Sequence, residues 1–95
     1  MATAKTAKTA NDVGAGPVLL TLYGRQHCHL CHEMIAALEE LQARLPFRFD
    51  IVDIDGDEEL RSRYNAFVPV LVGEGQEICR YHLDQAALVR FLGKP

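Results

Sequence analysis

The sequence lacks the features by which proteins of several functional classes are recognised. It has no excess of positive charge, because 13 acidic residues outnumber 10 lysines and arginines and give a formal net charge of −3. Proteins that bind the phosphate backbone usually present a basic face, so this balance argues against nucleic acid as a partner. No apolar run reaches the roughly 20 residues that a transmembrane helix needs, which argues against a membrane partner.

Cysteine is scarce, and its count of three is odd, unlike that of a disulfide-stabilised secreted scaffold. The first 16 residues are rich in alanine, threonine and lysine and lack the apolar segment of a secretion signal. We therefore expect a cytoplasmic protein. Residues 1–16 are expected to form a disordered leader, and residues 17–95 a single folded domain.

Hydrophobic periodicity predicts the elements of this domain. Strands are expected at residues 18–23, 47–54, 70–72 and 77–81, and helices at residues 29–45, 58–64 and 85–92. The nearly continuous apolar run of the first strand predicts burial on both faces, and Asn65 is expected to end the second helix in a left-handed conformation.

The order of these elements, βαβαββα, predicts an α/β domain. The first two strands are joined by a helix and should be parallel, whereas the last two are joined by residues 73–76 and should form a hairpin. A four-stranded mixed sheet with helices on both faces follows from this order.

Two cysteines, Cys28 and Cys31, lie where the first strand turns into the first helix. In a reducing compartment a C-x-x-C sequence indicates redox or metal chemistry rather than a structural disulfide. Unpaired N–H groups and the helix dipole at a helix N-terminus stabilise a thiolate and lower its pKa. This position predicts Cys28 as the nucleophile and Cys31 as the thiol that resolves a mixed disulfide.

A metal or haem group is the alternative use of the same motif. The run from Cys28 to His32 matches the C-x-x-C-H pattern of haem c attachment, but haem c proteins are exported and mostly helical. Zinc would need further ligands, and the sequence contains no second closely spaced pair. The side chains available to complete such a site are His27, His29, His32 and Cys79. We expect no metal and no tightly bound cofactor, while an iron–sulfur cluster or metal carried on Cys28 stays open as an alternative function.

The remaining histidine and cysteine side chains have simpler expected roles. The three histidines beside the cysteines are expected to be solvated at the helix start, although a role as proton donors stays open. Cys79 falls on a predicted strand and is expected to be a small buried residue.

The residues around the cysteines resemble the glutaredoxins, a family of the thioredoxin fold. In that family an apolar strand ends in tyrosine and is followed by a small residue, a basic residue, two more residues and C-x-x-C. Here the tyrosine is Tyr23, the small residue Gly24 and the basic residue Arg25. A Val-Pro pair opens the third strand of the family, and Val68-Pro69 occupies that place. The resemblance covers residues 18–92, whereas the Trp-Cys-Gly-Pro-Cys sequence of thioredoxins is absent because the chain has no tryptophan.

The resemblance implies a thioredoxin fold and a thiol–disulfide oxidoreductase that acts on protein or low-molecular-weight disulfides. It implies that Arg25 binds a glutathione carboxylate, that Val68 offers its backbone to the bound peptide or glutathione, and that Pro69 is cis and faces the cysteines. The implied partners are a disulfide-containing protein or glutathione, with glutathione also a candidate reductant, and we expect a monomer. A thioredoxin-fold adaptor with incidental thiols is the remaining alternative.

Two segments depart from the glutaredoxin pattern. His29-Leu30 stands between the cysteines where glutaredoxins have Pro-Tyr. The Gly-Gly-x-Asp-Asp segment that glutaredoxins use to hold the rest of glutathione is absent, and residues 79–84 take its place. Arg80 and Asp84 are the charged residues that could substitute for it.

Overall fold

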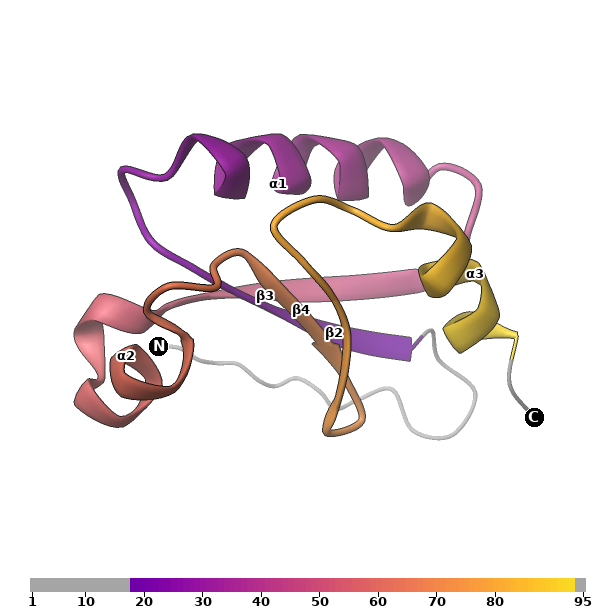
Figure 1. Cartoon of the computed structure of the whole chain (residues 1–95). Helices are drawn as coiled ribbons and strands as arrows, with labels where there is room; N and C mark the ends of the chain where they lie inside the picture. The colour runs from indigo at the N-terminus through magenta and orange to yellow at the C-terminus, as the bar shows by residue number, and fades with distance from the viewer. Residues whose placement is uncertain (1–17, 94–95) are drawn as a thin grey trace.

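A computed structural model describes residues 18–93, and the predicted disordered leader, residues 1–16, lies outside this range. The strands are β2 (Val18–Gly24), β3 (Phe47–Asp53), β4 (Val70–Gly73) and β5 (Gln76–Arg80). The helices are α1 (His29–Leu41), α2 (Glu58–Tyr64) and α3 (Gln85–Leu92), with a 3-10 turn, η2 (Ile54–Gly56), after β3. Figure 1 shows α1 lying along the sheet and α2 at the end of the sheet where α1 begins. No helix within residues 18–93 has the length and apolar character needed to span a bilayer.

The four strands form one mixed sheet in the order β3-β2-β4-β5. β2 pairs with β3 in parallel and with β4 in antiparallel orientation. β4 and β5 form a hairpin whose turn has positive φ angles of 52° at Glu74 and 76° at Gly75, as a tight turn between antiparallel strands requires. The predicted mixed four-stranded α/β sheet is confirmed.

The core lies between the sheet and the pair of helices α1 and α3. Side chains alternate along β2, so Leu20 and Leu22 point to this face, where both are fully buried. They pack in one apolar cluster with Leu38 of α1 and Leu88 of α3. Two helices that are far apart in the sequence, α1 and α3, therefore cover this face of the sheet and exclude solvent from it.

The opposite face of the sheet is more open. Tyr23 points to that face and stacks on Tyr64 of α2, with ring centroids 4.6 Å apart. Farther along β2, Leu19 is 42% exposed. The expected arrangement of helices on both faces is therefore present, but the prediction that residues 18–23 are buried on both faces is wrong, because α2 is short and packs at the Tyr23 end.

Two local predictions are also corrected. The first helix ends at Leu41 rather than at residue 45, because Arg44 and Leu45 both donate to the Leu41 carbonyl, at 2.9 Å each, in a closing turn. Asn65 is not left-handed: its φ is −45°, and its N–H donates to the Arg61 carbonyl as a continuation of α2. Its side chain instead accepts a hydrogen bond from Arg25.

Candidate active site

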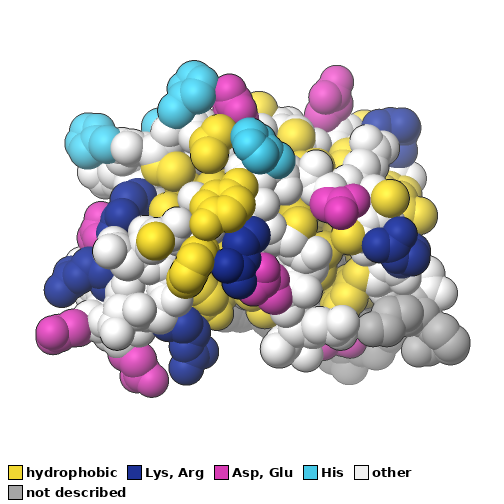
Figure 2. All heavy atoms as spheres, in the orientation of Figure 1, with side chains coloured by type: hydrophobic (Ala, Val, Ile, Leu, Met, Phe, Trp, Pro, Cys, Tyr) yellow, Lys and Arg dark blue, Asp and Glu magenta, His cyan; other side chains and the backbone are white. Residues whose placement is uncertain are grey.

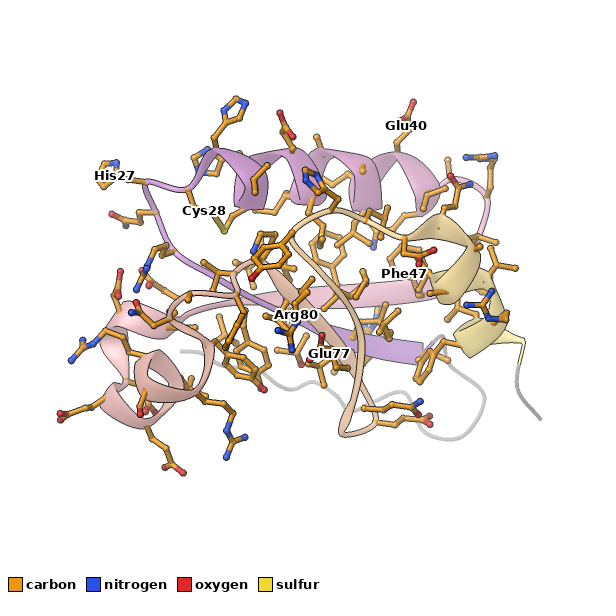
Figure 3. The ribbon with its side chains drawn as sticks, in the orientation of Figure 1. His27, Cys28, Glu40, Phe47, Glu77 and Arg80 are labelled. Atoms are coloured by element: carbon orange, nitrogen blue, oxygen red, sulfur yellow. A yellow bond between two sulfur atoms is a disulfide. The ribbon has the colours of Figure 1, made fainter. Side chains whose placement is uncertain are left out.

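The structure joins the two predicted cysteines of the site in a disulfide bond. The Cα atoms of Cys28 and Cys31 are 5.2 Å apart, within the range that a disulfide allows. Cys31 is only 2% exposed, whereas Cys28 is partly exposed at the start of α1 (Figure 3). A partner can therefore reach the sulfur of Cys28 more readily than that of Cys31.

Cys28 is also the N-cap of α1. Its backbone is extended, with φ −131° and ψ 104°, and its Sγ accepts a hydrogen bond from the Cys31 N–H at 3.1 Å. A serine or aspartate oxygen usually takes this position at the start of a helix. The sulfur thus lies where free helix N–H groups concentrate positive potential, which favours a thiolate once the bond is reduced.

The end of β2 is shaped to receive the buried cysteine. A Cβ atom placed on Gly24 would lie 3.1 Å from the Cys31 Sγ, closer than most Cβ atoms approach a neighbour. The small residue before Arg25 is therefore a steric requirement of the disulfide's position.

The Val68–Pro69 segment lies at the same end of the sheet. Tyr23 pairs with Val70, so the residues just before β4 lie beside those just after β2. The Val68–Pro69 peptide bond is cis, and Pro69 is buried.

Tyr81, which the sequence analysis did not single out, holds this segment. Its N–H donates to the Pro69 carbonyl at 2.8 Å, and its hydroxyl donates to the Ala66 carbonyl at 3.2 Å. Tyr81 itself adopts a positive φ of 69°. No pattern in the sequence predicts this contact, since it depends on a non-glycine residue in the left-handed region.

Arg25 is held by Asp55, which follows β3, and by Asn65, which was expected only to end the second helix. Its Nη2 lies 2.8 Å from Asp55 Oδ1 and its Nε 3.2 Å from Asp55 Oδ2. The same Nη2 donates to Asn65 Oδ1 at 2.8 Å. The hydrogen bond from Arg25 is the main cause that lowers the pKa of Asp55 below its usual value.

The parallel order of the first two strands, which the sequence predicts, is the signal for this contact. β2 and β3 run parallel, and Gly24 pairs with Asp53, so the residues that follow both strands leave the sheet at the same end. Arg25 and Asp55 are thereby brought together although they are 30 residues apart.

The charged residues considered as substitutes for the missing glutathione segment are engaged within the chain. Arg80 donates to both carboxylate oxygens of Glu77, at 2.7 and 2.9 Å, and lies over the ring of Phe67. The carboxylate of Asp84 accepts the Ala87 N–H at 3.0 Å as the N-cap of α3. Neither side chain is brought to the cysteines by any of these contacts.

Histidine side chains lie on the α1 side of the molecule, several of them toward the end where α1 begins (Figure 2). His29 is 85% exposed and lies 2.8 Å from the Glu33 carboxylate on the same helix. Over the described part of the chain, no group of three or more His, Cys, Asp and Glu side chains converges as a metal ion would require.

Cys79 lies on β5 and is half-buried against the core cluster. Burial raises the pKa of its thiol, so it is less reactive than an exposed cysteine. It pairs in the sheet with Leu71 rather than with either cysteine of the site.

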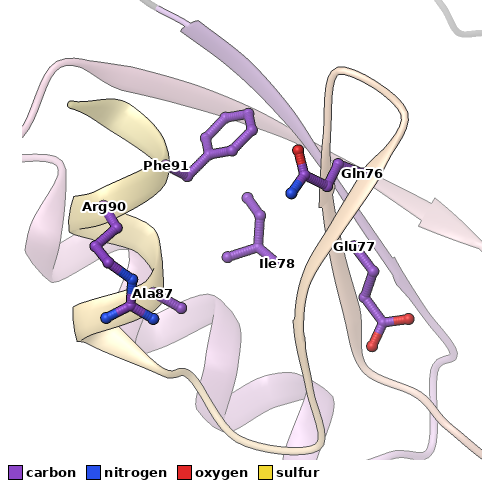
Figure 4. Close-up of a pocket in the computed structure, with 6 residues that line it drawn as sticks. All are labelled: Gln76, Glu77, Ile78, Ala87, Arg90 and Phe91. Atoms are coloured by element: carbon purple, nitrogen blue, oxygen red, sulfur yellow. The ribbon is translucent and has the colours of Figure 1, made fainter. Parts of the chain in front are cut away.

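Two hollows differ in their relation to the disulfide. A groove of about 270 Å3 between α1 and β3 is lined by Cys31, Gly24, Arg25, His32, Ile35 and Ile51, among others. A larger hollow of about 500 Å3 lies between β5 and α3 and includes Ile78 and Phe91 (Figure 4). No residue that lines the larger hollow belongs to the cysteine site, so of these two hollows the smaller groove is the one that adjoins the disulfide.

Comparison with known proteins identifies the family to which the chain is similar. The family model of the glutaredoxin-like domain (DUF836) matches residues 19–93. Protein Ne2328 from Nitrosomonas europaea is 44% identical, with a TM-score of 0.74 over 90% of this chain and 100% of its own. Protein XcR50 from X. campestris, solved by X-ray methods, is 40% identical, with a TM-score of 0.63 over 80% of this chain and 99% of its own.

More distant similarity extends to the thioredoxins. A mutant thioredoxin from Halobacterium salinarum is 23% identical, with a TM-score of 0.54 over 81% of this chain and 73% of its own, which indicates a shared fold alone. No match was found among curated proteins. The family match and the two closely similar structures together show that the chain belongs to the glutaredoxin-like family and has the thioredoxin fold.

Proposed function

We propose that the protein is a thiol–disulfide oxidoreductase that uses the Cys28–Cys31 pair. The observation that carries this proposal is the position of the Cys28 sulfur. It is partly exposed, caps α1 by accepting an N–H, and is bonded to a second, buried cysteine. This geometry provides an accessible nucleophile and a protected resolving thiol.

The proposed reaction begins with the reduced protein. The Cys28 thiolate attacks one sulfur of a substrate disulfide, the substrate's S–S bond breaks, and the departing thiolate takes up a proton. Cys31 then loses its proton and attacks the Cys28 sulfur, which forms the intramolecular bond and releases the second substrate thiol. Two electrons pass to the substrate, and a thiol donor restores the dithiol by the reverse exchange.

The substrate side of the proposal rests on the partly exposed Cys28 and on the Val68–Pro69 segment at the same end of the sheet. A protein or low-molecular-weight disulfide would approach Cys28, with the Val68 backbone available to the bound segment beside Pro69. The proposed setting is the reducing cytoplasm, and the proposed working form is a monomer with glutathione or another thiol system as its reductant.

Single-cysteine variants test the proposal. Cys28→Ser should abolish reduction of a disulfide substrate such as insulin or a glutathione mixed disulfide, because the nucleophile is lost. Cys31→Ser should instead accumulate a mixed disulfide on Cys28, visible as an increase in protein mass that a reductant removes. Cys79→Ser serves as the matched control and should retain turnover, whereas turnover by Cys28→Ser would refute the proposal.

A further inference from the structure

The positive charge nearest in sequence to the cysteines, Arg25, is matched by a carboxylate of the same chain. Arg25 makes a two-pronged contact with Asp55, in which two guanidinium nitrogens face the two carboxylate oxygens. The Arg25 side chain is 26% exposed and that of Asp55 48% exposed, so both partners can be reached from solvent. This is the geometry in which a guanidinium binds any carboxylate, including one on a ligand.

Arg25 and the disulfide border the same hollow. Arg25 lies three residues before Cys28 in the sequence and lines one groove together with Cys31, the disulfide partner of Cys28. A small thiol that carries a carboxylate, and that enters this groove, would bring its negative charge toward Arg25. With Asp55 in place, Arg25 is already paired, and the carboxylate of the thiol is also repelled by the carboxylate of Asp55.

We propose that Asp55 is a specificity-determining residue, which disfavours carboxylate-bearing small thiols at the Cys28–Cys31 disulfide by occupying Arg25. The inference rests on the proposed redox function of the cysteine pair. Among the candidate reductants and substrates it therefore disfavours glutathione, which carries carboxylates, and favours protein thiols and small thiols without a carboxylate.

The contacts around Arg25 allow the effect of the Asp55 charge to be tested without disturbing the position of Arg25. Asn65 holds Arg25 independently, through its side-chain oxygen at 2.8 Å and its backbone carbonyl at 3.4 Å. Replacing Asp55 with asparagine therefore removes the negative charge while leaving Arg25 anchored. The guanidinium would then be open to an external carboxylate.

The test uses two small thiols as probes, the anionic 3-mercaptopropionate and the neutral 2-mercaptoethanol. In each case one thiolate attacks Cys28, which frees Cys31 as a thiolate that takes a proton. A second thiolate then attacks the mixed disulfide, which releases the small-molecule disulfide and leaves both cysteines reduced. Acid quenching, alkylation under denaturing conditions and mass measurement report the two thiols gained above the one from Cys79.

The quantity compared is the ratio of the two reduction rates, anionic over neutral. In Asp55→Asn this ratio should rise about fivefold over wild type at low salt, the size expected for one charge near the reacting site. The rise should disappear at about 1 M salt, because exposed charges are then screened. The matched control, Glu58→Gln, removes one exposed negative charge at the start of α2 and should leave the ratio unchanged.

A second variant ties the effect to Arg25. Adding Arg25→Gln to Asp55→Asn should return the ratio to its wild-type value. An unchanged ratio in Asp55→Asn, an equal rise in Glu58→Gln, or a rise that survives the loss of Arg25 would overturn the inference alone. A wild-type disulfide that neither thiol reduces would instead overturn the proposed function, and this inference with it.

Discussion

Two glycines, one toward each end of the central strand pair, allow a comparison of how the molecule is built. Gly73 pairs with Leu20 in the sheet, and a Cβ atom there would lie 2.6 Å from the Phe91 ring and 2.8 Å from Leu20. Gly24 ends β2, and a Cβ atom there would lie 3.1 Å from the Cys31 sulfur. Both positions are buried, yet the first faces the apolar core and the second faces the Cys28–Cys31 disulfide.

The surroundings of the two glycines differ in kind. Around Gly73, contacts are made by apolar side chains that interlock, and interiors packed in this way resist any added volume. Beyond Gly24, the chain is held by directional contacts: the Arg25–Asp55 pair, the Asn65 side chain and the N-cap at Cys28. The comparison indicates that the packed end sets the stability of the fold, while the polar end sets the position and environment of the sulfurs.

The largest stability effect is expected at the packed end. Gly73→Ala should lower the free energy of unfolding by about 2–3 kcal/mol, because the new methyl group overlaps Phe91 and Leu20. Denaturant unfolding followed by circular dichroism measures the change. Gly56→Ala is the control, since a Cβ atom there has no neighbour within 4 Å, and an equal loss in both variants would contradict this explanation.

A smaller effect is expected at the end of the sheet that carries the disulfide. Gly24→Ala should lower the free energy of unfolding of the oxidised protein by about 1 kcal/mol, because the Cys31 sulfur must move by a few tenths of an ångström. The same denaturant experiment gives the value. A loss as large as that of Gly73→Ala would show that the two ends are equally rigid and would remove the distinction drawn here.

The smallest effect is expected on the pH dependence of stability. The pKa of Asp55 is lowered in the folded protein by the hydrogen bond from Arg25, so the carboxylate's contribution is present above its unfolded pKa and is lost as pH falls through the folded value. The stability difference between wild type and Asp55→Asn should therefore be present at pH 7 and close toward pH 2. Urea midpoints measured across this range test the sign, and a gap that widens in acid would contradict it.

Sequence reasoning succeeded where local patterns determine structure. Apolar spacing located the four strands and the three α-helices of residues 18–93, though not the 3-10 turn η2, and the strand–cysteine–helix order placed Cys28 at the start of α1. The predicted cysteine pair is joined as the spacing allows. These features depend on periods of two and 3.6 residues and on a turn, all of which are written within a few consecutive residues.

The wrong predictions concern residues whose structure depends on tertiary contacts. Leu45 keeps helical spacing from α1 but packs on the core from a turn, so periodicity alone placed the helix end too late. Leu19 looks like a buried strand residue, and only the short reach of α2 leaves it exposed. Asn65 was interpreted from its backbone preference, whereas its side chain is used to hold Arg25.

The parallel pairing of β2 and β3 has a consequence for how this protein can diversify. Because both strands end at the same end of the sheet, the stretch from η2 through α2 follows directly after β3 beside the end of β2. Of this stretch, only Ile54 is buried. Apart from Tyr64, which stacks on Tyr23, that stretch can therefore be varied with little effect on the buried core. Under the proposed function, a library confined to residues 55–63 should yield folded members that differ in their choice of redox partner.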